Sequence, residues 1–270
     1  MDACPHCDGS GFLIDEETRR AYPCECRPRR IARKRAAALT ARLPKRFRGV
    51  GFEREPVVSI ARANPHQVRA VKAYVNNIAE NLDQGRGIWF TGDVGTGKTT
   101  LAMLVSKAAL EQDRTVAIYS LPRLLGLLRE TYDDDAEYSL TELIDRLCSV
   151  DLLHIDDVGA EQTSEWVLEQ LYTIVNTRYE DGKALLLTTN LIGRDGDDHP
   201  AAPLRRQIGE RTVSRIWEIC GDPLPLFGDD NRMFAADRLA PPDDTPAPDE
   251  DDFNDLAWEE VQRPYGRPLN

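Results

Sequence analysis

The sequence predicts an α/β fold built on a mostly parallel β-sheet. Short apolar runs typical of buried strands alternate along the chain with amphipathic segments at helical spacing. A glycine-rich loop that can bind phosphate directly follows one predicted strand and opens a helix. The chain has 270 residues, of which 41% are hydrophobic. This is enough for one full-sized α/β domain with a small accessory module.

The predicted elements follow one another from residue 64 onward. A first helix is expected to begin with Asn64 as N-cap and Pro65 at its first position. Further amphipathic helices are predicted at 99–112, 121–132, 140–150 and 164–182, after the first one at 64–82. Short apolar runs predict strands at 87–90, 115–120, 151–155 and 184–190. Strands that alternate with helices in this way indicate a parallel sheet.

Composition argues against a membrane protein and leaves the binding partner open. The apolar runs are far too short to cross a bilayer, and the N-terminus lacks the pattern of a signal peptide. We therefore expect a cytoplasmic location, where six cysteines serve as metal ligands or core residues before disulfides. The net charge of −12 conceals a gradient, with 12 basic and 6 acidic residues in 1–48 but 4 and 12 in 229–270. Because binding depends on local patches, this acidity does not exclude nucleic acid.

The phosphate-binding loop spans residues 92–99 and fits the pattern G-x4-GK[ST] between a strand and a helix. Its glycines allow backbone N–H groups to turn toward phosphate oxygens, and the helix N-terminus adds partial positive charge. Lys98 is expected to reach the β- and γ-phosphates, and the Thr99 hydroxyl to ligate Mg²⁺. The residues expected to bind ATP here are Gly92, Asp93, Val94, Gly95, Thr96, Gly97, Lys98, Thr99 and Thr100.

Polar residues at the ends of later strands predict the rest of a hydrolytic site. Asp156 and Asp157 follow a buried strand; we assign Asp156 to Mg²⁺ and Asp157 to the attacking water. Asn190 ends the next strand and can hydrogen-bond the γ-phosphate or that water. Arg211 and Arg215 share one helix face, where an arginine can complete the site of a neighbouring copy. Arg215 is our first choice and Arg211 our second.

The N-terminal cysteines are spaced as metal ligands. CxxC and CxC pairs, separated by sixteen residues, are formed by Cys4, Cys7, Cys24 and Cys26. Four thiolates can close a tetrahedral Zn²⁺ site, whose binding would supply the folding free energy of so small a segment. Four incidental cysteines remain the alternative. Cys148 and Cys220 have no partner at metal spacing and are interpreted as core thiols.

Composition divides the chain into four regions. We expect a Cys4 zinc-binding module at 1–26, a basic linker or helix at 27–52, an ATPase domain at 53–238 and an acidic disordered tail at 239–270. Residues 27–52 contain no acidic side chain. They are either a salt-sensitive contact to DNA phosphates or a solvated linker.

Several of these motifs occur in the order seen in one known group of proteins. Over about residues 44–235 the chain resembles AAA+ ATPases of the DnaC/DnaI helicase-loader and IstB group, through the segments "PKRFRGVGFE", "GDVGTGKTTLA", "LLHIDDVGAEQTSEWVLEQLYTIVNTRYEDGKALLLTTNL", "IGERTVSRI" and "GDDNR". The cysteine pairs resemble the zinc module in front of DnaI-type loaders. The resemblance implies a P-loop sheet of five parallel strands in the order 5-1-4-3-2, with a reduced or absent lid. It also places Walker A at 92–99, Walker B at 152–157, sensor 1 at Asn190, the arginine finger at Arg215 and a sensor-2-like arginine at Arg232.

The resemblance also implies a function. Such a protein would use ATP binding and hydrolysis to load the replicative hexameric DNA helicase onto single-stranded DNA, self-associating in the ATP state. An IstB-like helper that delivers DNA to a transposase remains an alternative, although those helpers generally lack a Cys4 front end. An adaptor that binds ATP with little turnover is a third, and Asp157 and Asn190 count against it. The expected cofactors are ATP, Mg²⁺ and Zn²⁺.

Overall fold

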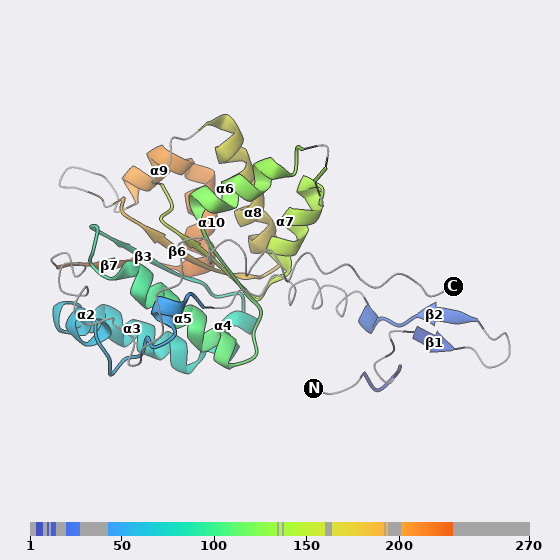
Figure 1. Cartoon of the computed structure of the whole chain (residues 1–270), viewed down its shortest axis with the longest axis horizontal. Coiled ribbons are helices and arrows are strands. Elements are labelled where there is room, and N and C mark those ends of the chain that lie inside the picture. The colour runs from blue at the N-terminus through green and yellow to red at the C-terminus, as the bar shows by residue number, and fades with distance from the viewer. Residues whose placement is uncertain are drawn as a thin grey trace, which may run out of the picture.

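The computed structural model describes residues 4–7, 10, 12–14, 20–27, 43–133, 135–136, 138–159, 164–191, 193 and 201–228. The acidic tail, most of the basic linker, Arg232 and any lid after the last strand lie outside the described residues. The main body has three layers, with a sheet between two layers of helices (Figure 1). None of the helices in the described ranges is long and apolar enough to cross a membrane.

The elements of the main body begin after a short 3-10 helix, η1 (Lys45–Phe47). The strands of its sheet are β3 (Ile88–Gly92), β4 (Val116–Ser120), β5 (Leu152–Asp156), β6 (Ala184–Thr189) and β7 (Leu224–Leu226). The helices are α2 (Val57–Ala63), α3 (Pro65–Asn76), α4 (Ile78–Asp83), α5 (Lys98–Glu111), α6 (Leu121–Glu130), α7 (Leu140–Ser149), α8 (Glu165–Glu180), α9 (Ala202–Ile208) and α10 (Glu210–Cys220).

The sheet has five parallel strands in the order β4-β5-β6-β3-β7. With β3 counted as the first strand, this is the order 5-1-4-3-2, so the prediction of a parallel AAA+ sheet is confirmed. The carboxyl ends of β3, β5 and β6 therefore meet at one edge of the sheet. Ligands of open α/β sheets bind at this edge.

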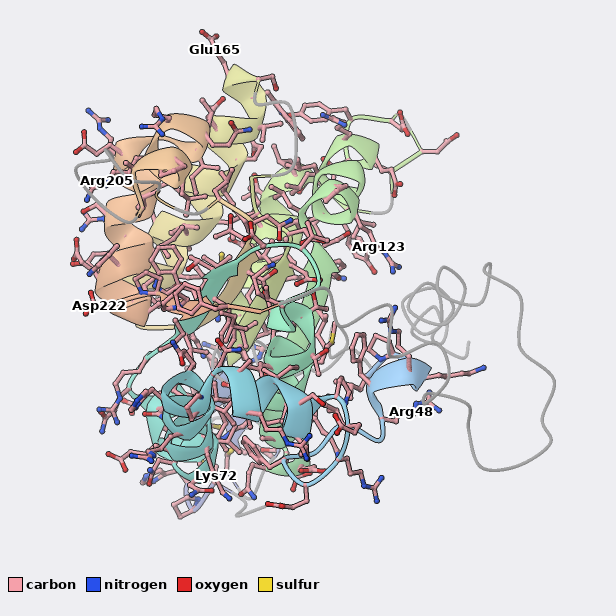
Figure 2. All side chains as sticks on the ribbon, turned by 90° about the vertical axis from the view of Figure 1, so that its left-hand side faces the viewer. Arg48, Lys72, Arg123, Glu165, Arg205 and Asp222 are labelled. Carbon is pink, nitrogen blue, oxygen red and sulfur yellow. The ribbon has the colours of Figure 1, made fainter. Side chains whose placement is uncertain are left out.

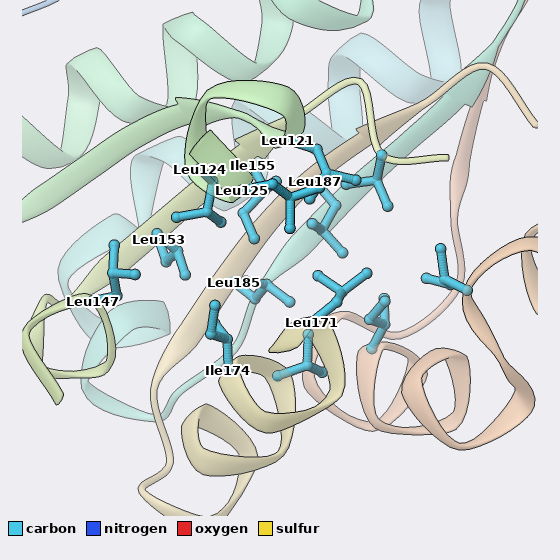
Figure 3. Packing of buried hydrophobic residues seen from close by; sticks show 14 of the residues in the cluster. Leu121, Leu124, Leu125, Leu147, Leu153, Ile155, Leu171, Ile174, Leu185 and Leu187 are labelled. Atoms are coloured by element: carbon cyan, nitrogen blue, oxygen red, sulfur yellow. The ribbon is translucent and has the colours of Figure 1, made fainter. Parts of the chain in front are cut away.

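Both faces of the sheet are buried, which explains the continuous apolar runs in the sequence. Leu153 and Leu185 point toward α6, α7 and α8, where they pack with Leu124 and Ile174 (Figure 3). The adjacent Leu152 belongs to the core on the other face, which α2 to α5 cover. Charged side chains such as Lys72 and Arg205 lie on the outer surfaces of the helix layers (Figure 2).

Side chains at the helix ends explain several boundaries. α7 starts with a capping box between Ser139 and Glu142, and α8 with a bond from Val167 N to Ser164 Oγ. Gly182 follows α8 at φ 59°, a conformation that favours glycine. The predicted helix at 64–82 is instead two helices, α3 and α4, which meet at Asn77.

The segment after β7 is fixed by Asn64. We predicted this residue as an N-cap and it does precede α3, but its side chain makes no cap bond. It donates from Nδ2 to Phe227 O and accepts from Phe227 N, both at 2.8 Å. This pair of bonds ties the start of α3 to the chain after the fifth strand. We did not predict β7 from the residue pattern, because it is short and contains Pro225, which is tolerated at a sheet edge.

A buried arginine joins the second helix layer to the sheet. Arg178 of α8 is fully buried, and its guanidinium donates to five backbone carbonyl oxygens, those of Leu147, Cys148, Val150, Asp151 and Ala184. These bonds cap the end of α7 and hold the starts of β5 and β6 together. Burial lowers the pKa of Arg178 to about 10, which still leaves the guanidinium charged at neutral pH.

Candidate nucleotide site and cysteine cluster

The phosphate loop joins β3 to α5 and depends on glycine at two close contacts. Gly97 has φ 100°, and a Cβ there would lie 2.3 Å from Ile60 Cδ1. A Cβ on Gly92 would lie 2.4 Å from Leu226 O of the edge strand. The neighbours of the loop therefore exclude side chains at these positions. This leaves the first turn of α5 open at the carboxyl edge of the sheet, with backbone N–H groups that have no intrahelical partner.

The side chain of Lys98 closes this loop from inside. It is buried, and Nζ donates to Gly92 O at 2.9 Å and Asp93 O at 2.7 Å. Thr96 Oγ1 donates to the same Asp93 oxygen at 2.8 Å. Val94 at the tip of the loop is half exposed. The ammonium group is thus held inside the loop against two backbone carbonyl oxygens, which a phosphate can replace.

Thr99 and Asp156 come together from different elements. Thr99 Oγ1, in the first turn of α5, lies 3.1 Å from both carboxylate oxygens of Asp156, at the end of β5. Two ligand oxygens at adjacent positions of an octahedral Mg²⁺ site with bonds of about 2.1 Å are about 3.0 Å apart. The oxygen donors and their separation therefore fit Mg²⁺.

Thr188 of β6 supports both acidic residues, and we did not predict its role. Its Oγ1 donates to Asp156 Oδ1 at 2.5 Å and accepts from Asp157 N at 2.9 Å. Asp157 is held at φ 57°, which turns the chain sharply after β5. A threonine inside the apolar run "LLLTTN" was the available signal, because a buried hydroxyl needs a partner.

Asp156 is ionised in spite of its surroundings. Burial raises its pKa, but the His154 imidazole and the hydroxyl bonds from Thr188 and Thr99 lower it, and the lowering prevails. A charged carboxylate at this edge is the form that can bind a cation.

Two further predicted residues, Asn190 and Arg215, lie on β6 and α10 respectively or directly after them. Asn190 is exposed and follows β6 directly, between the strands that lead to the phosphate loop and to Asp156. Arg215 of α10 stacks on Tyr179, 4.2 Å from the ring centroid, and donates to Glu218 at 2.9 Å.

The direction of α10 separates the two candidate arginines. Gly87 N donates to Ile219 O at 2.8 Å, so α10 ends beside the start of β3, away from the phosphate loop. Arg211 is exposed in the first turn of α10, about 6 Å nearer along the axis to the nucleotide edge than Arg215.

The four N-terminal cysteines converge around a short hairpin. β1 (Phe12–Ile14) pairs antiparallel with β2 (Ala21–Pro23), with one cysteine pair before the hairpin and the other after it. All four sulfur atoms lie within 4.8 Å of one another. The Sγ atoms are 3.9 Å apart for Cys4 and Cys24 and 3.4 Å for Cys7 and Cys26.

This geometry and donor set fit Zn²⁺. Four sulfurs around Zn²⁺ at about 2.3 Å form a tetrahedron with edges of about 3.8 Å. The neighbouring Cys7 thiol is the main cause that raises the pKa of Cys26 to about 12. Without a cation the Cys26 thiol therefore stays protonated, and a bound metal would stabilise its thiolate. Cys148 and Cys220 lie outside this cluster; burial raises the pKa of Cys148 to about 12, which is typical of an inert core thiol.

Comparisons with known proteins identify the domain that carries the nucleotide site. Residues 62–195 match the family model described as IstB-like ATP binding protein. The chain is 28% identical over 235 residues to the phage-like element PBSX protein XkdC of Bacillus subtilis, covering 83% of this chain and 82% of that protein. It is 26% identical over 149 residues to the replicative helicase loader DnaC of Buchnera aphidicola, covering 55% of this chain and 56% of the loader.

The structural comparison agrees with the sequence comparison. A crystal structure of the DnaC helicase loader superimposes with a TM-score of 0.58 and 26% identity, covering 68% of this chain and 100% of the other. In sequence, the match spans about half the length of the loader relative. Residues 62–195 of this chain therefore match the IstB-like ATP binding proteins, and the chain is similar in sequence and in its AAA+ sheet to the DnaC helicase loaders.

Proposed function

We propose that this protein is an ATP-dependent loader that places a replicative DNA helicase on single-stranded DNA. One observation carries the proposal: Lys98, Thr99 and Asp156 lie together at the carboxyl ends of the strands, as a nucleotide–Mg²⁺ site requires. The domain that contains them is related to helicase loaders. The sequence match covers about half the length of the loader relative. The helicase partner is therefore inferred from this similarity, whereas the nucleotide site is inferred from the geometry.

Each side chain at the edge has a role in this proposal. Lys98 and the loop N–H groups bind the β- and γ-phosphates, and Thr99 and Asp156 hold Mg²⁺. Bound Mg²⁺ neutralises charge that develops on the phosphates. Asp157 orients and deprotonates the attacking water, and Asn190 hydrogen-bonds the γ-phosphate. An arginine of a second copy, Arg215 or Arg211, completes the site, so that hydrolysis follows self-association.

In this proposal the cysteine module binds the helicase. A Cys4 zinc site holds a small hairpin rigid, and such a hairpin is suited to gripping a protein partner. Phe12, Leu13, Ile14 and Tyr22 on this hairpin are all at least 39% exposed. We assign this module to the helicase and the ATPase domain to single-stranded DNA and self-association. The basic segment 27–52 adds attraction to DNA phosphates.

The proposal is tested by reconstitution with the full chain. Purified protein and the replicative helicase of the same cell would be mixed with ATP or ADP and a single-stranded DNA circle, and helicase on the circle would be counted. We expect loading with ATP and its loss in Lys98→Ala. A chain that binds the helicase in neither nucleotide state contradicts the proposal.

The second candidate is a transposition helper, which the name of the matching family model favours. Co-purification from the native cell separates the two functions, because a helper would recover a transposase and no helicase. An adaptor with little turnover would bind ATP yet leave the rate of phosphate release unchanged when single-stranded DNA and protein concentration are raised.

A further inference from the structure

A histidine lies directly behind the acidic residue assigned to Mg²⁺. His154 is two residues before Asp156 on β5, so both side chains point to the α5 face of the sheet. It is fully buried, in a strand whose other buried residues are leucine and isoleucine. Burying an imidazole with an unpaired nitrogen costs about 1–3 kcal/mol, so packing alone would favour an aliphatic side chain at this position.

The two ring nitrogens of His154 have different neighbours. Nδ1 lies 3.0 Å from Ser106 Oγ, which is also fully buried, on α5. Nε2 lies 3.9 Å from Asp156 Oδ1, beyond hydrogen-bonding distance, and has no hydrogen-bond partner within the described part of the chain. The imidazole thus spans from the helix to the back of the carboxylate.

The position of the carboxylate determines which nitrogen carries the proton. A lone pair on Nε2 would face the negative oxygen of Asp156, and a hydrogen there faces it favourably. In the neutral ring, Nε2 is then the donor, and Nδ1 accepts from the Ser106 hydroxyl. The serine hydroxyl can serve either tautomer, so the carboxylate makes the difference.

Two parallel contacts therefore connect α5 to β5. Thr99 contacts Asp156, and Ser106, seven residues farther along the same helix face, contacts His154. Both contacts join the phosphate-binding helix to the strand that ends in Asp156.

We propose that His154 is a positioning residue: Ser106 orients the ring so that its Nε2–H faces Asp156 Oδ1 at 3.9 Å, and the electrostatic attraction favours the carboxylate orientation that binds Mg²⁺. The inference rests on the nucleotide site of the proposed function. It makes His154 a determinant of metal affinity in the nucleotide complex. The affinity for nucleotide in the absence of metal depends on the phosphate loop and not on His154.

The tautomer is tested in the wild-type protein without nucleotide. Imidazole nitrogen resonances of the ¹⁵N-labelled full chain would be recorded, and the His154 signals assigned by their loss in a His154 variant. We expect the proton on Nε2. A proton on Nδ1 overturns the proposal, whatever the protein does with ATP.

Two substitutions separate positioning from packing. In His154→Asn, the amide replaces Nδ1 toward Ser106 and no N–H group faces Asp156. In His154→Gln, the amide lies near the position of Nε2. The Mn²⁺ affinity of the ADP complex would be measured by electron paramagnetic resonance. We expect it to fall about 10–100-fold in the Asn variant, as when an outer-shell partner is lost, and to be largely restored in the Gln variant.

Fluorescent ADP binding in EDTA, and His66→Asn on exposed α3, provide the controls. We expect binding in EDTA to stay within about two-fold in both variants. If both the Asn and the Gln variant lost ADP affinity in EDTA as well as Mn²⁺ affinity, His154 would have only a packing role. Ser106→Ala provides a second test if either His154 variant does not fold. An unchanged Mn²⁺ affinity in Ser106→Ala contradicts the proposal that Ser106 orients His154. Because no readout needs turnover, helicase or DNA, failure of the loader function is distinguishable from failure of this inference.

Discussion

The hydroxyl of Thr188 lies 2.5 Å from Oδ1 of Asp156 and also accepts the backbone N–H of Asp157. One side chain of β6 therefore holds both acidic residues at the end of β5. The neighbouring strand thus positions the residues assigned to Mg²⁺ and to the attacking water.

Replacing Thr188 by valine keeps its shape and removes both bonds. We expect Thr188→Val to lower the free energy of unfolding by about 1–3 kcal/mol, because the Asp156 carboxylate loses one of its two hydroxyl partners and the Asp157 N–H loses its bond to Thr188. The Thr188 bond lowers the pKa of Asp156, so its stabilisation is present above the ordinary value of 3.8 and is lost as the pH falls through the lowered pKa. Urea unfolding at pH 7 and pH 3 measures the difference, which should shrink at pH 3.

The control for this change is Thr173→Val on α8, a partly exposed threonine. Thr173 bonds within its own helix, to Glu169 O, and its replacement should cost less than about 0.5 kcal/mol. Equal losses in the two variants would contradict the role of Thr188.

Lys98→Ala removes the ammonium from the centre of the phosphate loop. We expect the affinity for ATP to fall at least about tenfold, because a charge-assisted contact to phosphate contributes about 1.5–3 kcal/mol. Titration of a fluorescent ATP analogue measures it, with Lys72→Ala on exposed α3 as the control. An unchanged affinity would remove the nucleotide site from this loop.

Mixing two inactive variants tests whether an arginine acts on a neighbour. Lys98→Ala and Arg215→Ala chains should each lack turnover, while their mixture should regain part of it. The reason is that a site with intact Lys98 then meets a neighbour with intact Arg215. The same mixture with Arg211→Ala identifies which of the two arginines acts. If no mixture regains turnover, the arginine is not supplied by a second copy.

Zinc should be bound at one equivalent per chain, as measured by atomic absorption on purified protein. Cys24→Ser should abolish this signal, since a structural Zn²⁺ site needs four ligands, and Cys148→Ala should leave it unchanged. Removal of zinc by a chelator should expose the hairpin at 12–23 to protease. Nucleotide binding should be retained, because the main body has its own core. A chain purified without zinc would contradict the metal assignment.

Arg178→Met should destabilise the protein by about 3 kcal/mol or more, because five buried carbonyl oxygens lose their donor. Arg178→Lys should recover little of this, since one ammonium cannot reproduce the planar fork. Arg69→Met on the surface of α3 is the control, and thermal unfolding is the measurement. A shift in Tm of Arg178→Met as small as that of the control would show that these bonds contribute little.

The local features of this protein follow from residues that are neighbours in the chain. Glycine spacing predicts a phosphate loop around Lys98, and apolar runs located four of the five strands, because backbone geometry and periodicity are properties of neighbouring residues. The cysteine spacing indicated a cluster, and the sulfur positions agree with it. The strand order came from resemblance, since periodicity does not say which strands pair.

Contacts between residues far apart in the chain could be found only from the folded structure. The sequence pattern does not predict β7 as a strand, but it pairs with β3 in the folded chain. The pattern predicts Asn64 as a helix cap, but its side chain bonds Phe227. Thr188 and His154 read as polar residues inside apolar strands. Their roles depend on contacts with Asp156 that form when β5, β6 and α5 pack together. Such contacts join residues far apart in the chain, and the burial that makes each one necessary exists only after folding.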